Sequence, residues 1–299
     1  MSAQGSIYDL GYQGYDGARL GRLAVTLGLL RATLRAAYGI GRGGRAKIAP
    51  FGLAGLGLLP AVLAVGIAAL AAQAGAGGAL AEASPIRHET YQSLTSTLVM
   101  LFCAAQAPEL FGRDQRYGVL PLFFSRVLTR TDYALARTGG LFLAVFLVSV
   151  VPQVVLTIGG ILAASDPLVG LADEAPDIPR YLAVTALGSA ILAGVAAAIS
   201  AWTPRRAYAT AAIIAAFIIP SVVAILVAEL AVGDLARIIV LLSPGDIVDG
   251  INAEIFATIP DSPAVAASGL PGWAFVASAV TGCIGLVALI LRRYQAISG

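Results

Sequence analysis

Between Thr138 and Ser165 the chain reads TGGLFLAVFLVSVVPQVVLTIGGILAAS, without a single charged side chain. A helix rises about 1.5 Å per residue, so about 20 apolar residues cross a hydrocarbon layer of about 30 Å. Charge-free stretches of this kind occupy residues 48–81, 90–108, 138–165, 181–204, 207–228 and 262–291 of the 299-residue chain. The sequence therefore predicts an all-α membrane protein with six transmembrane helices, at about residues 50–73, 91–108, 138–164, 181–203, 208–229 and 271–291.

The composition agrees with this class. Hydrophobic residues make up 58 % of the chain and charged residues 12 %, whereas soluble domains carry about 25 % charged residues. The two cysteines, Cys103 and Cys283, both fall inside apolar stretches without metal-ligand spacing, so we predict neither a disulfide framework nor a metal site. His88 is the single histidine, and we interpret it as a solvated residue of an outer loop. No pattern predicts nucleic-acid binding or catalysis by this chain.

Most of the basic residues lie in alternate gaps between the apolar stretches. Lys and Arg are retained on the cytoplasmic side of short loops, so these gaps and both termini are predicted to be cytoplasmic. The basic residues in question are Arg19, Arg22, Arg31, Arg35, Arg42, Arg45, Lys47, Arg113, Arg116, Arg126, Arg130, Arg137, Arg205, Arg206, Arg292 and Arg293. Most acidic residues lie in the other gaps, which we place outside.

The cytoplasmic N-terminal region, residues 1–47, contains a predicted amphipathic helix. Large apolar residues recur in steps of three and four, which places them on one helix face; they are Leu20, Leu23, Leu27, Leu30 and Leu34. Arginines flank this stripe at Arg19, Arg22, Arg31 and Arg35. Long arginine side chains reach lipid headgroups from such a position, so we expect the helix to lie on the inner membrane surface against lipids. An amphipathic helix packed on the protein itself is the alternative.

The remaining residues, 48–299, form the predicted six-span domain, which has two further features. In the outer segment 233–261 the apolar run 238–242 is far too short to cross the membrane. We predict one or two short helices that re-enter the outer leaflet or cap the bundle; a plain solvated loop is the alternative. Within the spans, Gln106, Gln153 and Pro220 are candidate residues of a substrate path. Hydrogen bonding between helices is the alternative role for the amides.

Between the second and third spans the chain reads PELFGRDQRYGVLPLFFSR from Pro108 to Arg126, followed by TRTDY from Thr129 to Tyr133. This segment resembles the cytoplasmic coupling loop of bacterial ABC type-2 permeases, in which a Glu ends the second span and an Arg-Asp-x-Arg cluster follows. The N-terminal stretch YDGARLGR, Tyr15 to Arg22, resembles the opening of the same family. The order of amphipathic helix, six spans and outer re-entrant segment is similar as well.

The resemblance implies the permease subunit of an ATP-binding cassette exporter in a bacterial cytoplasmic membrane. Two copies of a separate ATPase would hold ATP and Mg²⁺, and a second copy of the permease or a homologous one would complete the assembly. The coupling loop would be residues 109–137. The residues expected to contact the ATPase are Glu109, Arg113, Asp114, Arg116, Tyr117, Phe123, Phe124 and Arg126. The apolar linings suggest an amphipathic or lipid-like substrate.

Three other functional classes place different requirements on the sequence. An ion-coupled secondary transporter is expected to carry ionisable residues near the middle of its spans, and the six stretches have none. An intramembrane enzyme requires a constellation of catalytic groups, and we find none in the sequence. A membrane scaffold that does not transport stays open.

Overall fold

The computed structural model describes residue 17 and residues 21–73, 86–125, 128–230 and 233–296. All regular elements in these ranges are helices. Six of them are long and apolar enough to cross a membrane: α2 (Arg45–Gln73), α4 (His88–Arg116), α6 (Arg130–Ala163), α8 (Asp177–Trp202), α9 (Arg206–Glu229) and α13 (Gly272–Gln295). The predicted class, an all-α multi-pass membrane protein, is confirmed.

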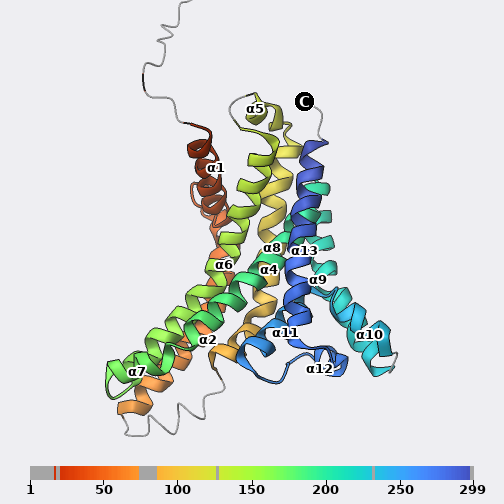
Figure 1. The fold of residues 1–299 in the computed structure, drawn as a ribbon. Helices are drawn as coiled ribbons and strands as arrows, with labels where there is room; N and C mark the ends of the chain where they lie inside the picture. The colour runs from red at the N-terminus through yellow and green to blue at the C-terminus, as the bar shows by residue number, and fades with distance from the viewer. Residues whose placement is uncertain (1–16, 18–20, 74–85, 126–127, 231–232, 297–299) are drawn as a thin grey trace, which may run out of the picture.

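The short helices lie at the two ends of the bundle. The end at the top of Figure 1 carries α1 (Arg22–Ala37), α5 (Leu120–Phe124) and the end of α13, and we call it the α5 end. The other end, called the α11 end, carries α7 (Pro167–Glu174), α10 (Gly233–Val240), α11 (Pro244–Phe256) and α12 (Pro263–Ser268). The helices diverge toward the α11 end, with α2 and α7 on one side and α9 and α10 on the other (Figure 1).

The core lies between α4, α6 and α8. These three helices bury about half or more of their most apolar windows inside the protein, whereas α2, α9 and α13 bury less than a fifth of theirs. The largest core cluster joins Phe102 and Phe111 of α4, Val145 of α6 and Leu192 of α8. Exposed apolar faces on α2, α9 and α13 are what a protein surrounded by lipid or by another membrane subunit presents.

Glycines allow two peripheral helices to approach α6 closely. A Cβ atom at Gly140 would lie 2.6 Å from the Cβ of Thr33, so α1 packs where α6 has no side chain. A Cβ atom at Gly159 would collide with Val65 of α2 in the same way. Small residues at such contacts let helix backbones come together in a membrane.

Helices α4 and α6 extend well beyond the predicted spans 91–108 and 138–164, so most of the described residues of the segment 109–137 are helical. α4 continues to Arg116, where Arg113 and Arg116 lie in its last turn and interact favourably with the helix dipole. α6 already begins at Arg130, where Thr129 and Asp132 form a reciprocal capping box. Absence of charge locates the part of a helix inside the hydrocarbon, and these helices continue into the polar region.

The outer segment forms helices that pack on the bundle. Ile247 and Ile251 of α11 are buried in a second apolar cluster together with Phe275 of α13, and the Cβ position of Gly250 is filled by the Phe275 ring. The alternative of a plain solvated loop is therefore wrong for α11. Entry of this segment into the outer leaflet stays a prediction.

Candidate functional site at the α5 end

A buried ion pair ties α4 to α6 at the α5 end. Asp114 of α4 is paired with the guanidinium group of Arg137 in α6, and it accepts a hydrogen bond from the Tyr133 hydroxyl at 2.6 Å. Arg137 also donates to the Thr33 hydroxyl of α1 at 3.3 Å. Since the side chains of Arg137 and Asp114 are only 10 % and 13 % exposed, Asp114 works within the chain and has little surface to offer a partner.

Glu109, the acid that the sequence places at the end of the second span, also has internal partners. Its carboxylate accepts a hydrogen bond from Arg42 at 2.9 Å and lies 3.5 Å from Arg206. Arg42 belongs to the turn after α1, and Arg206 begins α9. Glu109 thus joins the turn after α1 and the start of α9 to α4, and its charge offsets the repulsion between the two arginines.

The turn after α1 is anchored in the same region by Tyr38. Its hydroxyl donates to the carbonyl oxygen of Ala144 at 2.8 Å, and its ring lies 5.8 Å from the rings of Phe51 and Phe102. Burial raises the pKa of Tyr38 to about 12, because the phenolate would lose its hydration. The hydroxyl therefore stays protonated and remains a donor.

A cavity of about 500 Å³ opens between α1 and α4 beside these ion pairs. Four residues that the sequence assigns to ATPase contact line it together: Glu109, Arg113, Asp114 and Tyr117. Arg42 and Arg137 complete its charged lining. Arg113 is exposed and is thus the cation of this group that a partner could reach most directly.

The short helix α5 has an inward side and an outward side. Phe123 and Phe124 are half-buried, and their rings lie 5.4 and 5.8 Å from the ring of Tyr133. The exposed apolar groups are Tyr117, at 67 %, and Leu122, at 69 %. Both phenylalanines were predicted as contacts for a partner and Leu122 was not, because a five-residue helix is too short for its sequence to show which side is buried.

The other predicted contact residues are placed as follows. Arg116 is exposed, and its guanidinium lies 5.6 Å from the centre of the Tyr117 ring. Arg126 lies outside the described residues. The exposed set Arg113, Arg116, Tyr117 and Leu122 is called the α5 surface below.

Helix α1 packs on α6 through a face that the leucine stripe did not identify. The buried residues are Leu29, Thr33 and Ala37, spaced by four, whereas Leu27 is 49 % exposed and Leu30 is half-buried. The alternative of packing on the protein is thus correct for one face of the helix. Contact with lipid through the exposed leucines stays a prediction.

The arginines of this helix are mostly outward. Arg31 and Arg35 are exposed. Arg22 reaches α6, where its Nε atom lies 2.7 Å from a carboxylate oxygen of Asp132. Arg19 lies outside the described residues.

The three candidate residues of a substrate path do not come together. Gln153 is 1 % exposed and Gln106 is 6 % exposed, while Pro220 is half-buried within α9. In the described part of the chain, none of the three lines the cavity between α1 and α4 or the cavities at the α11 end. For Gln153 the structure shows hydrogen bonding between helices.

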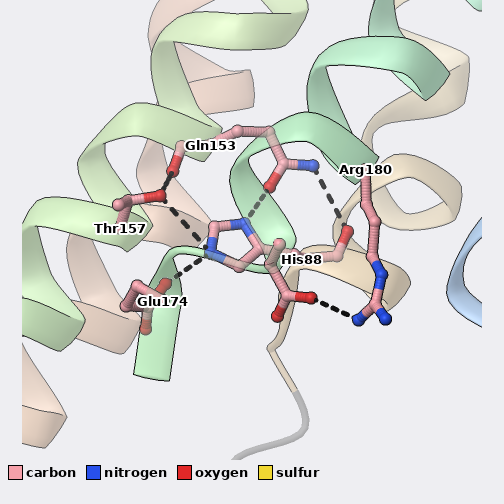
Figure 2. Close-up of polar contacts among 6 residues, drawn as sticks. His88, Gln153, Thr157, Glu174 and Arg180 are labelled. Carbon is pink, nitrogen blue, oxygen red and sulfur yellow. Dashed lines mark hydrogen bonds and ion pairs between the residues drawn. The ribbon is translucent and has the colours of Figure 1, made fainter. Parts of the chain in front are cut away.

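The interpretation of His88 as a solvated loop residue is wrong. His88 begins α4 and is 7 % exposed. Its Nδ1 lies 2.6 Å from the Gln153 amide oxygen and its Nε2 lies 3.0 Å from the Glu174 carboxylate, as Figure 2 shows. The ring also stacks on Tyr181 at 5.0 Å. Both polar partners are acceptors, so a ring with a proton on each nitrogen satisfies them fully.

This cluster joins helices that are far apart in the chain. His88 belongs to α4, Gln153 and Thr157 to α6 and Glu174 to α7, and the four side chains converge in Figure 2. The charge-free stretch begins at residue 90, which placed His88 in the preceding loop, although the helix already starts there. Within the described ranges, no group of three or more His, Cys, Asp or Glu side chains could hold a metal ion.

No protein-family model matches this chain, and no curated protein matches it either.

Proposed function

We propose that this chain is the permease subunit of an ATP-binding cassette exporter, and that a separate ATPase binds its α5 surface. The single observation that supports this most is α5 itself. A short helix projects from the connection between two core helices, with Tyr117 and Leu122 exposed and two arginines beside them. Aromatic and arginine residues are the types that most often dominate binding energy at protein interfaces.

The contacts beneath α5 support a mechanical role. Phe123 and Phe124 pack on Tyr133 of α6, and Tyr133 donates to Asp114 of α4. The Tyr133 ring also lies 5.2 Å from the ring of Tyr294 in α13. A displacement of α5 by the closing of two ATPase subunits would therefore move α4, α6 and α13 together as a rigid unit.

The proposed assembly contains two ATPase copies, which hold ATP and Mg²⁺, and a second permease. The exposed apolar faces of α2 and α9 are available for a second permease copy or for lipid. The transported compound is amphipathic or lipid-like, and the assembly lies in the cytoplasmic membrane of a bacterium with the α5 end in the cytoplasm. The charge distribution supports this orientation, because the basic gaps meet at the α5 end.

A charge placed on the α5 surface tests the proposal. Leu122→Asp puts a carboxylate where an apolar anchor is expected, and Leu168→Asp is the matched control. Both leucines are exposed, at 69 % and 76 %, on short helices at opposite ends of the protein.

The tagged full-length chain is purified from its native membranes, and the bound ATPase is identified by mass spectrometry and by ATP hydrolysis. We expect the native chain and Leu168→Asp to retain an ATPase of the cassette family and Leu122→Asp to lose it. Retention of the same ATPase by Leu122→Asp, or purification of a chain that is functional in transport without any ATPase, would refute the proposal.

A further inference from the structure

Two cavities on the surface of α4 join into one groove. Helix α4 packs against both α2 and α9. One cavity, of about 780 Å³, lies between the end of α4 and the start of α9, and the other, of about 450 Å³, lies between α4, α2 and α9. Ala105, Thr210 and Ile214 line both cavities, so the two are continuous. We call the combined surface the α4 groove.

The end of the α4 groove that lies toward the α5 end is basic. Its lining includes Arg116 in the last turn of α4, and Arg205 and Arg206 at the start of α9. Arg206 lies 3.5 Å from Glu109, but this carboxylate is shared with Arg42. Arg116 and Arg205 are both exposed and form no ion pair with any acidic residue that the structure describes. The positive charge at this end of the groove is therefore only partly balanced within the described chain.

Away from the arginines the α4 groove is apolar. Thr210 is the one hydroxyl residue of its described lining, and its hydroxyl donates to the carbonyl oxygen of Ala104 at 3.1 Å. Leu56 of α2 and Leu101 of α4 line the groove and are 56 % and 41 % exposed. An apolar groove of this kind, cut into the side of membrane-spanning helices, favours a hydrocarbon chain as its occupant.

The length of the α4 groove matches one leaflet of a bilayer. Along α4 its lining extends from Arg116 to Leu101, which at 1.5 Å per residue is about 22 Å. One leaflet with its headgroups is about 20–22 Å deep, half the thickness of a whole bilayer. The guanidinium of Arg205 lies 5.9 Å from the centre of the Tyr208 ring, and Tyr208 is 62 % exposed. Exposed tyrosines of this kind are enriched where a membrane meets water, so the arginines lie at the level of the headgroups.

We propose that the α4 groove binds an anionic phospholipid from the leaflet at the α5 end. The lipid phosphate accepts hydrogen bonds from Arg116 and Arg205, whose planar guanidinium groups match phosphate oxygens in pairs. An acyl chain lies along α4 between α2 and α9. Basic pockets between membrane-spanning helices bind acidic headgroups in this way. Binding of this lipid does not depend on the transport function proposed above.

The test measures lipid binding to the full-length chain in a neutral detergent by native mass spectrometry, which reports bound lipids and chain copies together. Phosphatidylglycerol is compared with phosphatidylcholine of the same acyl chains. Arg116→Gln combined with Arg205→Gln removes two charges and leaves no described acid without its partner. The matched control is Arg113→Gln combined with Arg292→Gln, because both arginines are exposed at the same end and neither lines the α4 groove.

We expect the native chain to bind phosphatidylglycerol at least about tenfold more tightly than phosphatidylcholine, because each arginine near the headgroups strengthens binding several-fold. The variant with Arg116→Gln and Arg205→Gln should lose this preference, and the control should keep it. Equal binding of phosphatidylglycerol by the native chain and this variant, at equal thermal stability, would overturn the proposal. So would a native chain that binds the two lipids equally.

A second variant covers the case in which the first does not fold. Ala211 is exposed and lines the groove beside the arginines, so Ala211→Trp should abolish the preference for phosphatidylglycerol. Ala277→Trp, at an exposed position of α13 outside the groove, should keep it. Undiminished preference in Ala211→Trp would overturn the proposal.

The same assay distinguishes the lipid from other occupants. If glycerol 3-phosphate displaces phosphatidylglycerol at equal concentration, the arginines bind a free phosphate and the proposal is wrong. If dimers of the chain carry no phosphatidylglycerol while monomers do, a second copy covers the groove and the proposal is wrong. Because the assay contains no ATPase, its failure would leave the transport proposal unaffected.

Discussion

The ion pair between Asp114 and Arg137 should be one of the largest single polar contributions to the stability of the α5 end. Its side chains are 13 % and 10 % exposed, so removal of one partner leaves an unpaired charge that is largely buried and poorly hydrated. Loss of one partner of a buried pair costs about 3–5 kcal/mol. We expect Asp114→Asn and Arg137→Met each to lower the free energy of unfolding by this amount.

The double variant separates the pair from other effects of the substitutions. With both charges removed no charge is left unpaired, so Asp114→Asn combined with Arg137→Met should fall short of the sum of the single effects by about 3 kcal/mol. Unfolding is followed by circular dichroism in mixed micelles with increasing dodecyl sulfate.

The pair Arg22 and Asp132 provides the matched control, because it also joins an arginine to an aspartate across two helices. Its arginine side chain is 58 % exposed, and exposed pairs contribute about 0.2–1 kcal/mol. The same cycle on this pair should therefore give a much smaller coupling energy than the cycle on Asp114 and Arg137. Additive effects of the two substitutions at Asp114 and Arg137 would refute the reasoning, because they would show that burial does not strengthen the pair.

Two other predictions concern contacts between helices. Gly140→Ala places a methyl group 2.6 Å from Thr33, so it should lower the thermal unfolding midpoint and expose α1 to protease. In the control Gly139→Ala the methyl group meets its nearest atom only at 3.4 Å, and neither property should change. Equal effects of the two substitutions would contradict the close packing of α1 on α6. His88→Ala leaves the Glu174 carboxylate without its ring partner and should cost about 1–3 kcal/mol of stability, measured by the same detergent titration, and a stability equal to that of the native chain would show that the cluster is not formed.

The sequence predicts where the helices cross the membrane and fails to predict where they end. Absence of charge locates the six helices that are long and apolar enough to span a membrane, because the hydrocarbon layer disfavours charged side chains. The same criterion assigned Asp114 and Arg137 to a loop, although both lie on helices that continue past the apolar part. The capping box of Thr129 and Asp132 was a local signal for the start of α6.

The polar clusters are less accessible to sequence reasoning. His88 contacts Gln153, which is 65 residues away in the sequence, and Glu174, which is 86 residues away. Nothing local in the chain indicates that these side chains meet. Asp246 depends in the same way on Ser221 and Ser262 of other segments. Such groups are brought together only by the packing of whole helices.

The docking of α1 on α6 imposes an order on biosynthesis. Arg22 and its partner Asp132 are 110 positions apart, so the N-terminal helix leaves the ribosome long before its binding surface is made. At about 5–20 residues per second, the delay is roughly 5–20 s. During that interval the helix has no partner within its own chain at this face, and the nascent protein must keep Leu29 and Thr33 covered by the bilayer surface or by a chaperone until the third crossing is in place.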